Sequence, residues 1–206
     1  MIVKVCGITT TEQFTWLSQH GVDMIGLNFF SQSKRYIGRL FSGLNETSKS
    51  KKIGVFVNPD LSYLLEIMEE YQLDMVQLHG NETVAFCNEV SKKIHVIKAF
   101  GVDENFSFSD TEPYLKSVRY LLFDTKSKSF GGSGLKFNWH KLSEYQFDMP
   151  FLLSGGIKLD DILEIKDLKY PELAGIDVNS GFEISPGIKD LDEINKMLKI
   201  VNNDES

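Results

Sequence analysis

Eight short apolar runs, rich in β-branched residues, recur along this chain and constrain its fold more than any other feature. Runs of this length and composition are typical of buried β-strands. Their starts lie about 20 to 31 residues apart, which leaves room for one helix and two loops each time. The runs cover residues 2–6, 24–29, 53–57, 74–79, 95–100, 119–124, 150–155 and 174–179.

Most segments between these runs have the pattern of amphipathic helices. Thr9 and Glu12 predict a capping box at the start of the first helix, and Asp190 predicts the N-cap of the last. Segments 38–52 and 103–118 show weaker helical patterns. In 60–71 and 190–201, helical spacing predicts that the buried faces are formed by Leu61, Leu64, Leu65 and Met68, and by Leu191, Ile194 and Leu198.

Alternating strands and helices form parallel sheets, and eight such units predict a (βα)8 barrel, the TIM barrel. An open doubly wound sheet is the alternative, but such sheets more often have five or six strands. With 206 residues the chain is near the minimal length for a barrel. We therefore expect one barrel domain over residues 1–201 and a frayed tail over 202–206.

Composition excludes several classes of partner. The formal net charge of −7 argues against nucleic acid or anionic lipid, because both require a basic surface. The chain has no run of 18 apolar residues, and its start lacks the apolar core of a signal peptide. Two cysteines, Cys6 and Cys87, make no disulfide framework. We expect a cytoplasmic protein without membrane contact.

Chemistry in a barrel of this type takes place at the carboxyl ends of the strands. Because side chains alternate along a strand, Lys4 and Cys6 point the same way, as do Gln77 and His79. A thiol and a carboxylate can therefore face each other across the barrel mouth. The predicted strand-end residues are Cys6, Asn28, Asn58, His79, Phe100, Asp124, Ser154 and Asp177.

Cys6 and Asp124 each have a simpler interpretation. Most free cysteines are small buried hydrophobes, and Cys87, in a helical segment, fits that role. Asp124, taken alone, is equally compatible with a helix cap or a loop carboxylate. A thiol with a pKa of about 8.5 acts as a base only beside a positive charge. Lys4, on the same face as Cys6, favours the functional interpretation.

Glycine-rich loops follow the sixth, seventh and eighth predicted strands. The loops after strands seven and eight of such barrels commonly bind phosphate through backbone N–H groups. Ordinary tight turns are the alternative interpretation. The candidate phosphate-binding residues are Gly132, Gly134, Gly155, Gly156, Ser180 and Gly181.

Two further polar residues are candidates for ligand contacts. Arg35, in the loop after the second strand, can hold a carboxylate through two parallel hydrogen bonds, although a surface charge is equally compatible with its position. His79 ends the fourth strand, and we expect it to be neutral and hydrogen-bonded. The four histidines have no metal-ligand spacing, so we expect no metal site.

Taken in order, these pieces resemble the phosphoribosylanthranilate isomerase family of tryptophan biosynthesis. The resemblance covers residues 3 to about 190. Four residues depart from the usual family pattern: Lys34, Ser133, Asn138 and Asn179. The matching segments are "KVCGIT", "GLNFFSQSKRYI", "GVFVN", "VQLHGNE", "VIKAF", "LFDTKSKSFGGSGLKFNW", "LSGGI" and "GIDVNSGFEISPGIKD".

The resemblance implies an Amadori rearrangement of N-(5-phosphoribosyl)anthranilate. Asp124 would be the general acid, Cys6 the general base, and Arg35 the partner of the anthranilate carboxylate. The glycines and Ser180 would bind the phosphate, while Lys4, His79 and Asp177 line the pocket. The resemblance implies a small phosphosugar substrate, no cofactor, and a monomer or homodimer.

Two alternative functions are still compatible with the sequence. The histidine-pathway isomerase performs the same rearrangement with a pair of aspartates, and Cys6 at the end of the first strand disfavours it. A catalytically silent phosphosugar-binding protein would keep the glycine loops but would not need both Cys6 and Asp124.

Overall fold

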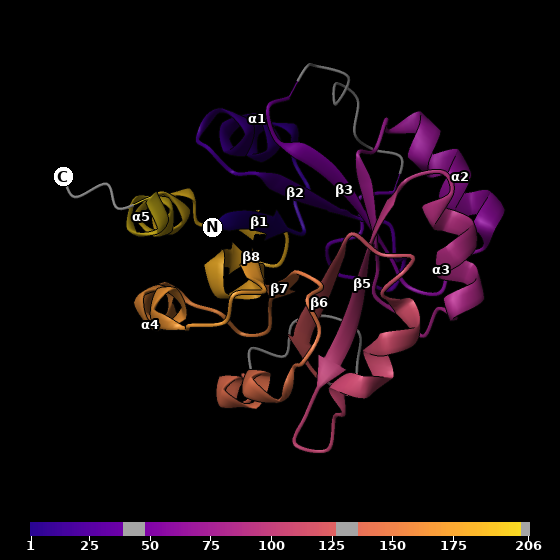
Figure 1. Cartoon of the computed structure of the whole chain (residues 1–206). Coiled ribbons are helices and arrows are strands. Elements are labelled where there is room, and N and C mark those ends of the chain that lie inside the picture. Colours follow the sequence, from indigo (N-terminus) through magenta and orange to yellow (C-terminus); the bar gives the residue numbers. More distant parts are fainter. Residues whose placement is uncertain (39–47, 127–135, 203–206) are drawn as a thin grey trace.

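Eight parallel strands close into a barrel in the computed structural model of the chain, which describes residues 1–38, 48–126 and 136–202 (Figure 1). The order around the barrel is the order along the chain, and β1 pairs with β8 to close it. This confirms the predicted TIM barrel. The strands are β1 (Ile2–Cys6), β2 (Met24–Asn28), β3 (Lys51–Phe56), β4 (Met75–Leu78), β5 (His95–Val102), β6 (Tyr120–Thr125), β7 (Phe151–Leu153) and β8 (Leu173–Val178).

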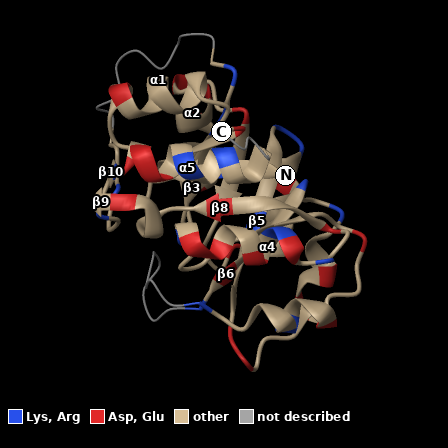
Figure 2. Ribbon diagram, turned by 90° about the vertical axis from the view of Figure 1, so that its left-hand side faces the viewer, with Lys and Arg blue, Asp and Glu red and all other residues tan. Residues whose placement is uncertain are grey.

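The helices surround the barrel (Figure 1), and the remaining strands of the described residues form a small hairpin, labelled β9 and β10 in Figure 2. Two connections contain only 3-10 helix within the described residues, η1 (Phe108–Tyr114) and η2 (Trp139–Glu144), and η1 contains Pro113. The α-helices are α1 (Thr11–Gln19), α2 (Leu61–Glu70), α3 (Val84–Ser91), α4 (Ile162–Asp167) and α5 (Leu191–Asn202). The short elements near the last strands are η3 (Leu159–Asp161), η4 (Ser180–Phe182), β9 (Glu183–Ser185) and β10 (Ile188–Lys189).

Three helix predictions differ in detail from the structure. Thr10, not Thr9, caps α1, because its hydroxyl accepts the amide of Gln13, while Thr9 donates to the carbonyl of Gly187. Leu61 is exposed, and the buried face of α2 is centred on Leu64 and Ile67. The predicted tail begins one residue too early, since α5 continues to Asn202. The other tail residues, 203–206, and most of the weak segment 38–52 lie outside the described residues.

The barrel interior is apolar in its lower part and polar at the carboxyl ends of the strands. A cluster separate from the main core contains the inward side chains, and alternation along β4 and β6 then points Gln77 and Asp124 inward above Met75 and Leu122. This layering positions polar groups at the mouth. The interior cluster consists of Met24, Ile53, Met75, Ile97, Ala99, Leu122 and Leu152.

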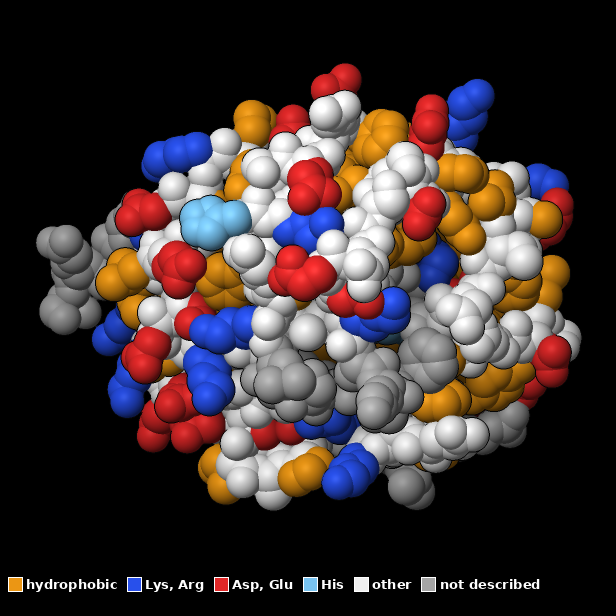
Figure 3. Space-filling model, turned by 90° about the horizontal axis from the view of Figure 1, so that it is seen from below, with side chains coloured by type: hydrophobic (Ala, Val, Ile, Leu, Met, Phe, Trp, Pro, Cys, Tyr) orange, Lys and Arg blue, Asp and Glu red, His pale blue; other side chains and the backbone are white. Residues whose placement is uncertain are grey.

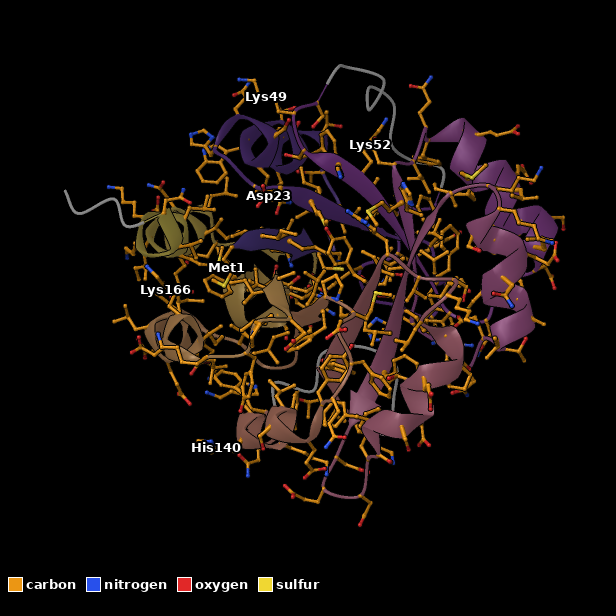
Figure 4. All side chains as sticks on the ribbon, viewed as in Figure 1. Met1, Asp23, Lys49, Lys52, His140 and Lys166 are labelled. Carbon is orange, nitrogen blue, oxygen red and sulfur yellow. The ribbon has the colours of Figure 1, made fainter. Side chains whose placement is uncertain are left out.

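The outer surface mixes charges of both signs. Acidic and basic residues are interspersed over α4 and α5 (Figure 2), and the face in Figure 3 shows the same mixture around separate apolar patches. His140, on η2, is exposed at the periphery (Figure 4). In the described part of the chain, no helix has the length and apolarity needed to cross a bilayer.

Candidate active site

A cavity that is partly open to solvent lies at the carboxyl ends of the barrel strands. Six of the eight predicted strand-end residues line it, whereas Asn58 and Phe100 are not part of its lining. Gln77, Asn179 and backbone from the last two loops complete much of the wall. The six strand-end residues are Cys6, Asn28, His79, Asp124, Ser154 and Asp177.

Cys6 enters the cavity from β1, and its thiol is buried. Its register neighbour on β2 is Gly26, where an added Cβ would lie 2.7 Å from the Cys6 sulfur, so the glycine makes room for the thiol. Burial raises the pKa of Cys6 above its ordinary value, although Lys4 and Lys189 each act to lower it. The positive charge that a basic thiol requires is present, but desolvation is the larger effect.

Lys4 lies beneath Cys6 on the same strand face and does not line the cavity. Its ammonium donates to Oδ1 of Asp177 at 2.8 Å, and the two side chains are 0% and 4% exposed. Burial raises the pKa of Asp177, with the attraction of Lys4 acting against it. For Lys4 burial acts to lower the pKa, but attraction to Asp177 leaves it raised. The pair is therefore a buried ion pair below the thiol.

His79 connects two other residues of the wall. Its Nδ1 lies 2.8 Å from Nε2 of Gln77, and its Nε2 lies 3.2 Å from Oδ2 of Asp124. Because a carboxylate only accepts, the Nε2–H of His79 donates to Asp124, while Nδ1 faces the amide of Gln77. The other carboxylate oxygen, Oδ1, accepts the backbone N–H of Thr125 at 2.8 Å. Asp124 is thus oriented by two donors.

Gln77 is a site residue that the sequence interpretation did not select. It is fully buried, and its Oε1 has no hydrogen-bond partner among the described residues. The signal was present in the alternation of β4, which points Gln77 and His79 the same way. The connection of Gln77 to Asp124 can be inferred only from the structure, in which His79 lies between the two residues.

Backbone from the loops after β7 and β8 forms another wall of the cavity. Gly155 and Gly156 have φ of 95° and 65°, a region that glycine occupies without strain. An added Cβ on Gly155 would lie 2.5 Å from the amide nitrogen of Thr125 and 2.9 Å from Oδ1 of Asp124. Ser180 and Gly181 also line the cavity, whereas Gly132 and Gly134 lie outside the described residues.

Arg35 does not line the cavity. Its Nε and Nη2 donate to the two carboxylate oxygens of Glu183, at 2.8 and 2.6 Å. Lys189 donates to the same carboxylate and to Oδ1 of Asn179, at 2.7 Å each. Sequence interpretation missed Glu183 and Lys189, because the hairpin of β9 and β10 lies beyond the last barrel strand and carries no strand-end signal.

Comparison with known proteins decides the family. Residues 3–200 match the family model described as N-(5'phosphoribosyl)anthranilate (PRA) isomerase. The chain belongs to this family. The predicted enzyme class, an isomerase of tryptophan biosynthesis, is thereby confirmed.

Relatives named N-(5'-phosphoribosyl)anthranilate isomerase match the chain almost end to end. The protein of Parabacteroides distasonis is 39% identical over 204 residues, covering 97% of this chain and 92% of its own. The isomerase structure from Thermotoga maritima is 33% identical with a TM-score of 0.84, covering 98% of this chain and all of its own. A phosphoribosylanthranilate isomerase in complex with reduced 1-(o-carboxyphenylamino)-1-deoxyribulose 5-phosphate has 32% identity, a TM-score of 0.78 and the same coverage.

The departures from the usual phosphoribosylanthranilate isomerase pattern leave Cys6 and Asp124 unchanged. Asn138 caps η2, where its side chain accepts the amide of His140 at 3.1 Å. Asn179 receives the ammonium of Lys189. Ser133 lies outside the described residues, and nothing in the structure explains Lys34. In the described parts of the chain, no three His, Cys, Asp or Glu side chains form a group able to hold a metal ion.

Proposed function

We propose that this chain converts N-(5-phosphoribosyl)anthranilate into 1-(2-carboxyphenylamino)-1-deoxy-D-ribulose 5-phosphate, with Asp124 as general acid and Cys6 as general base. The observation that carries the proposal is the shared cavity of Cys6 and Asp124 in a member of this family. The relative that binds a reduced form of this ribulose phosphate supports the choice of substrate. The oriented carboxylate and the thiol near two ammonium groups suit proton transfer.

In the first step, the protonated carboxyl group of Asp124 transfers its proton to the ring oxygen of the furanose. The bond between that oxygen and C1 breaks, and the lone pair of the anthranilate nitrogen forms the C=N bond of an iminium ion. The N–H of His79 and the amide of Thr125 then stabilise the carboxylate that remains. Proton transfer by a positioned side chain contributes about 10²–10⁴-fold to the rate.

In the second step, the thiolate of Cys6 takes the proton from C2 of the sugar. The C–H electron pair becomes the C1=C2 bond, and the iminium electrons return to nitrogen as a neutral enolamine. The enol hydroxyl then loses its proton while C1 gains one, which yields the ketone. Because the iminium ion acidifies the C–H bond, a thiolate is a sufficiently strong base and the chain's own residues complete the rearrangement.

The ends of the substrate would bind on either side of these two groups. The backbone at Gly155, Gly156, Ser180 and Gly181 would hold the phosphate, because N–H groups in such loops bind anions without a side-chain charge. Gly132 and Gly134 belong to the same proposal. Arg35 would bind the anthranilate carboxylate.

Turnover of purified protein, followed by the loss of phosphoribosylanthranilate fluorescence, tests the proposal. We expect Cys6→Ser and Asp124→Asn each to lower kcat by at least about 100-fold, because each removes one proton transfer. Binding of the reduced product analogue should persist in both variants. Cys87→Ser, which removes the thiol buried on α3, is the control and should keep its rate, as should the wild type with a chelator. Near-normal turnover in either site variant would refute the assigned roles.

A further inference from the structure

Arg35, Glu183 and Lys189 form a buried charged cluster beside the cavity, and the proposed reaction assigns no role to the last two. Their side chains are 11%, 4% and 0% exposed. Oε1 of Glu183 accepts three donors: Nε of Arg35 at 2.8 Å, Nζ of Lys189 at 2.7 Å and the backbone N–H of Gly187 at 3.1 Å. The carboxylate is thus fixed on the hairpin of β9 and β10.

Glu183 contacts one particular edge of the guanidinium. The bonds from Nε and Nη2 form a side-on pair. A guanidinium has five N–H groups in a planar fork, and a side-on pair uses two of them. The adjacent end-on edge, formed by Nη1 and the second N–H of Nη2, has the same bidentate geometry and suits another carboxylate. Glu183 therefore orients Arg35 without occupying its end-on edge.

The charges of the cluster do not cancel. Arg35 and Lys189 carry two positive charges and Glu183 one negative charge, so the cluster has a net charge of +1. Burial alone would raise the pKa of Glu183, but Arg35 and Lys189 hold it below its usual range, so the carboxylate is ionised. A buried excess charge is unfavourable unless it is paired. One substrate carboxylate would complete the pairing.

The cluster is adjacent to the base. The methylene stem of Arg35 passes Gly7, where an added Cβ would lie 2.5 Å from Cδ of Arg35 and 2.8 Å from Oδ1 of Asn179. Gly7 follows Cys6 and has a φ of 77°, so glycine both permits the turn and leaves space for the arginine. Asn179 lines the cavity and receives Lys189. A ligand over Cys6 is therefore within reach of this cluster.

We propose that Glu183 and Lys189 are positioning residues for the carboxylate of the substrate. Glu183 holds Arg35 side-on so that its end-on edge meets the carboxylate, and Lys189 keeps Glu183 paired so that Arg35 retains its attraction for an anion. This inference rests on the proposed function and extends it to two residues that do not themselves touch the substrate.

Two ligands test the proposal: the reduced product analogue, and the same molecule with aniline in place of anthranilate. We expect the wild type to bind the carboxylated ligand at least about tenfold more tightly, the effect of hydrogen bonds to a charged group. Glu183→Gln and Lys189→Met should remove most of this preference while the affinity for the aniline ligand changes less than about twofold. Lys141→Met, which breaks a pair with Glu144 outside the cavity lining, is the matched control and should keep the preference.

A double-mutant cycle shows whether Glu183 acts through Arg35. In an Arg35→Ala background, Glu183→Gln should leave the affinity for the carboxylated ligand unchanged, because the group that it orients is absent. If Glu183→Gln weakens both ligands equally, or still acts without Arg35, the cluster is merely structural and the inference is overturned. If Glu183→Gln does not fold, Lys189→Met and its comparison of the two ligands decide the matter. Failure of the proposed function is seen separately, as a wild type that does not turn over phosphoribosylanthranilate.

Discussion

At the scale of single residues, the thiol of Cys6 is subject to opposing effects. Desolvation favours the neutral thiol, whereas Lys4 and Lys189 favour the thiolate and Asp177 opposes it. Because desolvation is the largest of these effects, the pKa of Cys6 is raised. A base with a raised pKa is mostly protonated at neutral pH but is intrinsically stronger, so the thiolate fraction of Cys6 should depend steeply on pH.

We therefore expect the thiolate fraction of Cys6 in the free enzyme to rise with pH from 7 to 9, by about tenfold per unit, because that fraction grows in this proportion below the pKa of the thiol. The thiolate absorbance of Cys6, measured by titration in a Cys87→Ser background, should follow this rise and give a pKa above that of an ordinary thiol. In Lys189→Met that pKa should increase further, since a positive charge near the sulfur is lost. A thiol that titrates well below pH 8 would contradict the prediction.

Period-two alternation made Cys6, His79 and Asp124 predictable from the sequence, because the carboxyl ends of barrel strands share one mouth. The structure brings these three residues to one cavity. Glu183 and Lys189 were not predictable, since Glu183 contacts Arg35 across 148 residues of chain and Lys189 belongs to the cluster through its contact with Glu183. Pairings of this kind depend on how a hairpin outside the barrel folds back, which local patterns do not encode.

At the scale of elements, the turn after β7 supports Asp124 on β6 by direct approach. Gly155 adopts a φ of 95°, and its Cα lies so close to Thr125 and Asp124 that no side chain fits between them. The same turn contributes backbone to the proposed phosphate site. One glycine thus couples the position of the proposed acid to the loop that would hold the phosphate.

Gly155→Ala should therefore reduce catalysis beyond any general loss of stability. A Cβ at a positive φ costs about 1–2 kcal/mol in any setting. At Gly155 it must also displace Thr125 and Asp124, so we expect a lower kcat and a higher KM together. Gly21→Ala is the matched control, because its φ is 87° and an added Cβ there meets nothing within 4 Å. If steady-state kinetics show the two variants to be alike, the steric coupling is absent.

Helices and strands were predictable where the sequence carries a clear local pattern of apolar and capping residues. The eight strands begin and end within two residues of the predicted runs. The Asp190 cap of α5 is confirmed, because its side chain accepts the amides of Asp192 and Glu193. The weak helical pattern of 103–118 became the 3-10 helix η1, whose interior Pro113 cannot donate an α-helical hydrogen bond. Leu61 matched the helical stripe but lies at the first turn, beyond the edge of the core.

At the scale of the whole molecule, the barrel closes where the two ends of the chain meet. β1 and β8 are in parallel register, with Lys4 opposite Asp177, 173 residues apart in sequence. The ion pair of Lys4 and Asp177 is buried between these two strands and lies below Cys6. The pairing of β1 with β8 therefore closes the sheet, and it also places a positive charge next to the thiol. Mutation can separate these two effects.

We expect Lys4→Met to lower the free energy of unfolding by about 3–5 kcal/mol, because it leaves a buried carboxylate without its partner. Lys4→Met combined with Asp177→Leu should recover most of that loss, since apolar side chains of similar volume can replace a buried ion pair. We expect the kcat of the double variant to remain below that of the wild type, because Cys6 has lost the ammonium of Lys4 that favours its thiolate. Urea unfolding and kcat measured on the same preparations separate the two effects. A stable single variant would show that Asp177 does not need its cationic partner, and a fully active double variant would show that the thiol does not need the ammonium of Lys4.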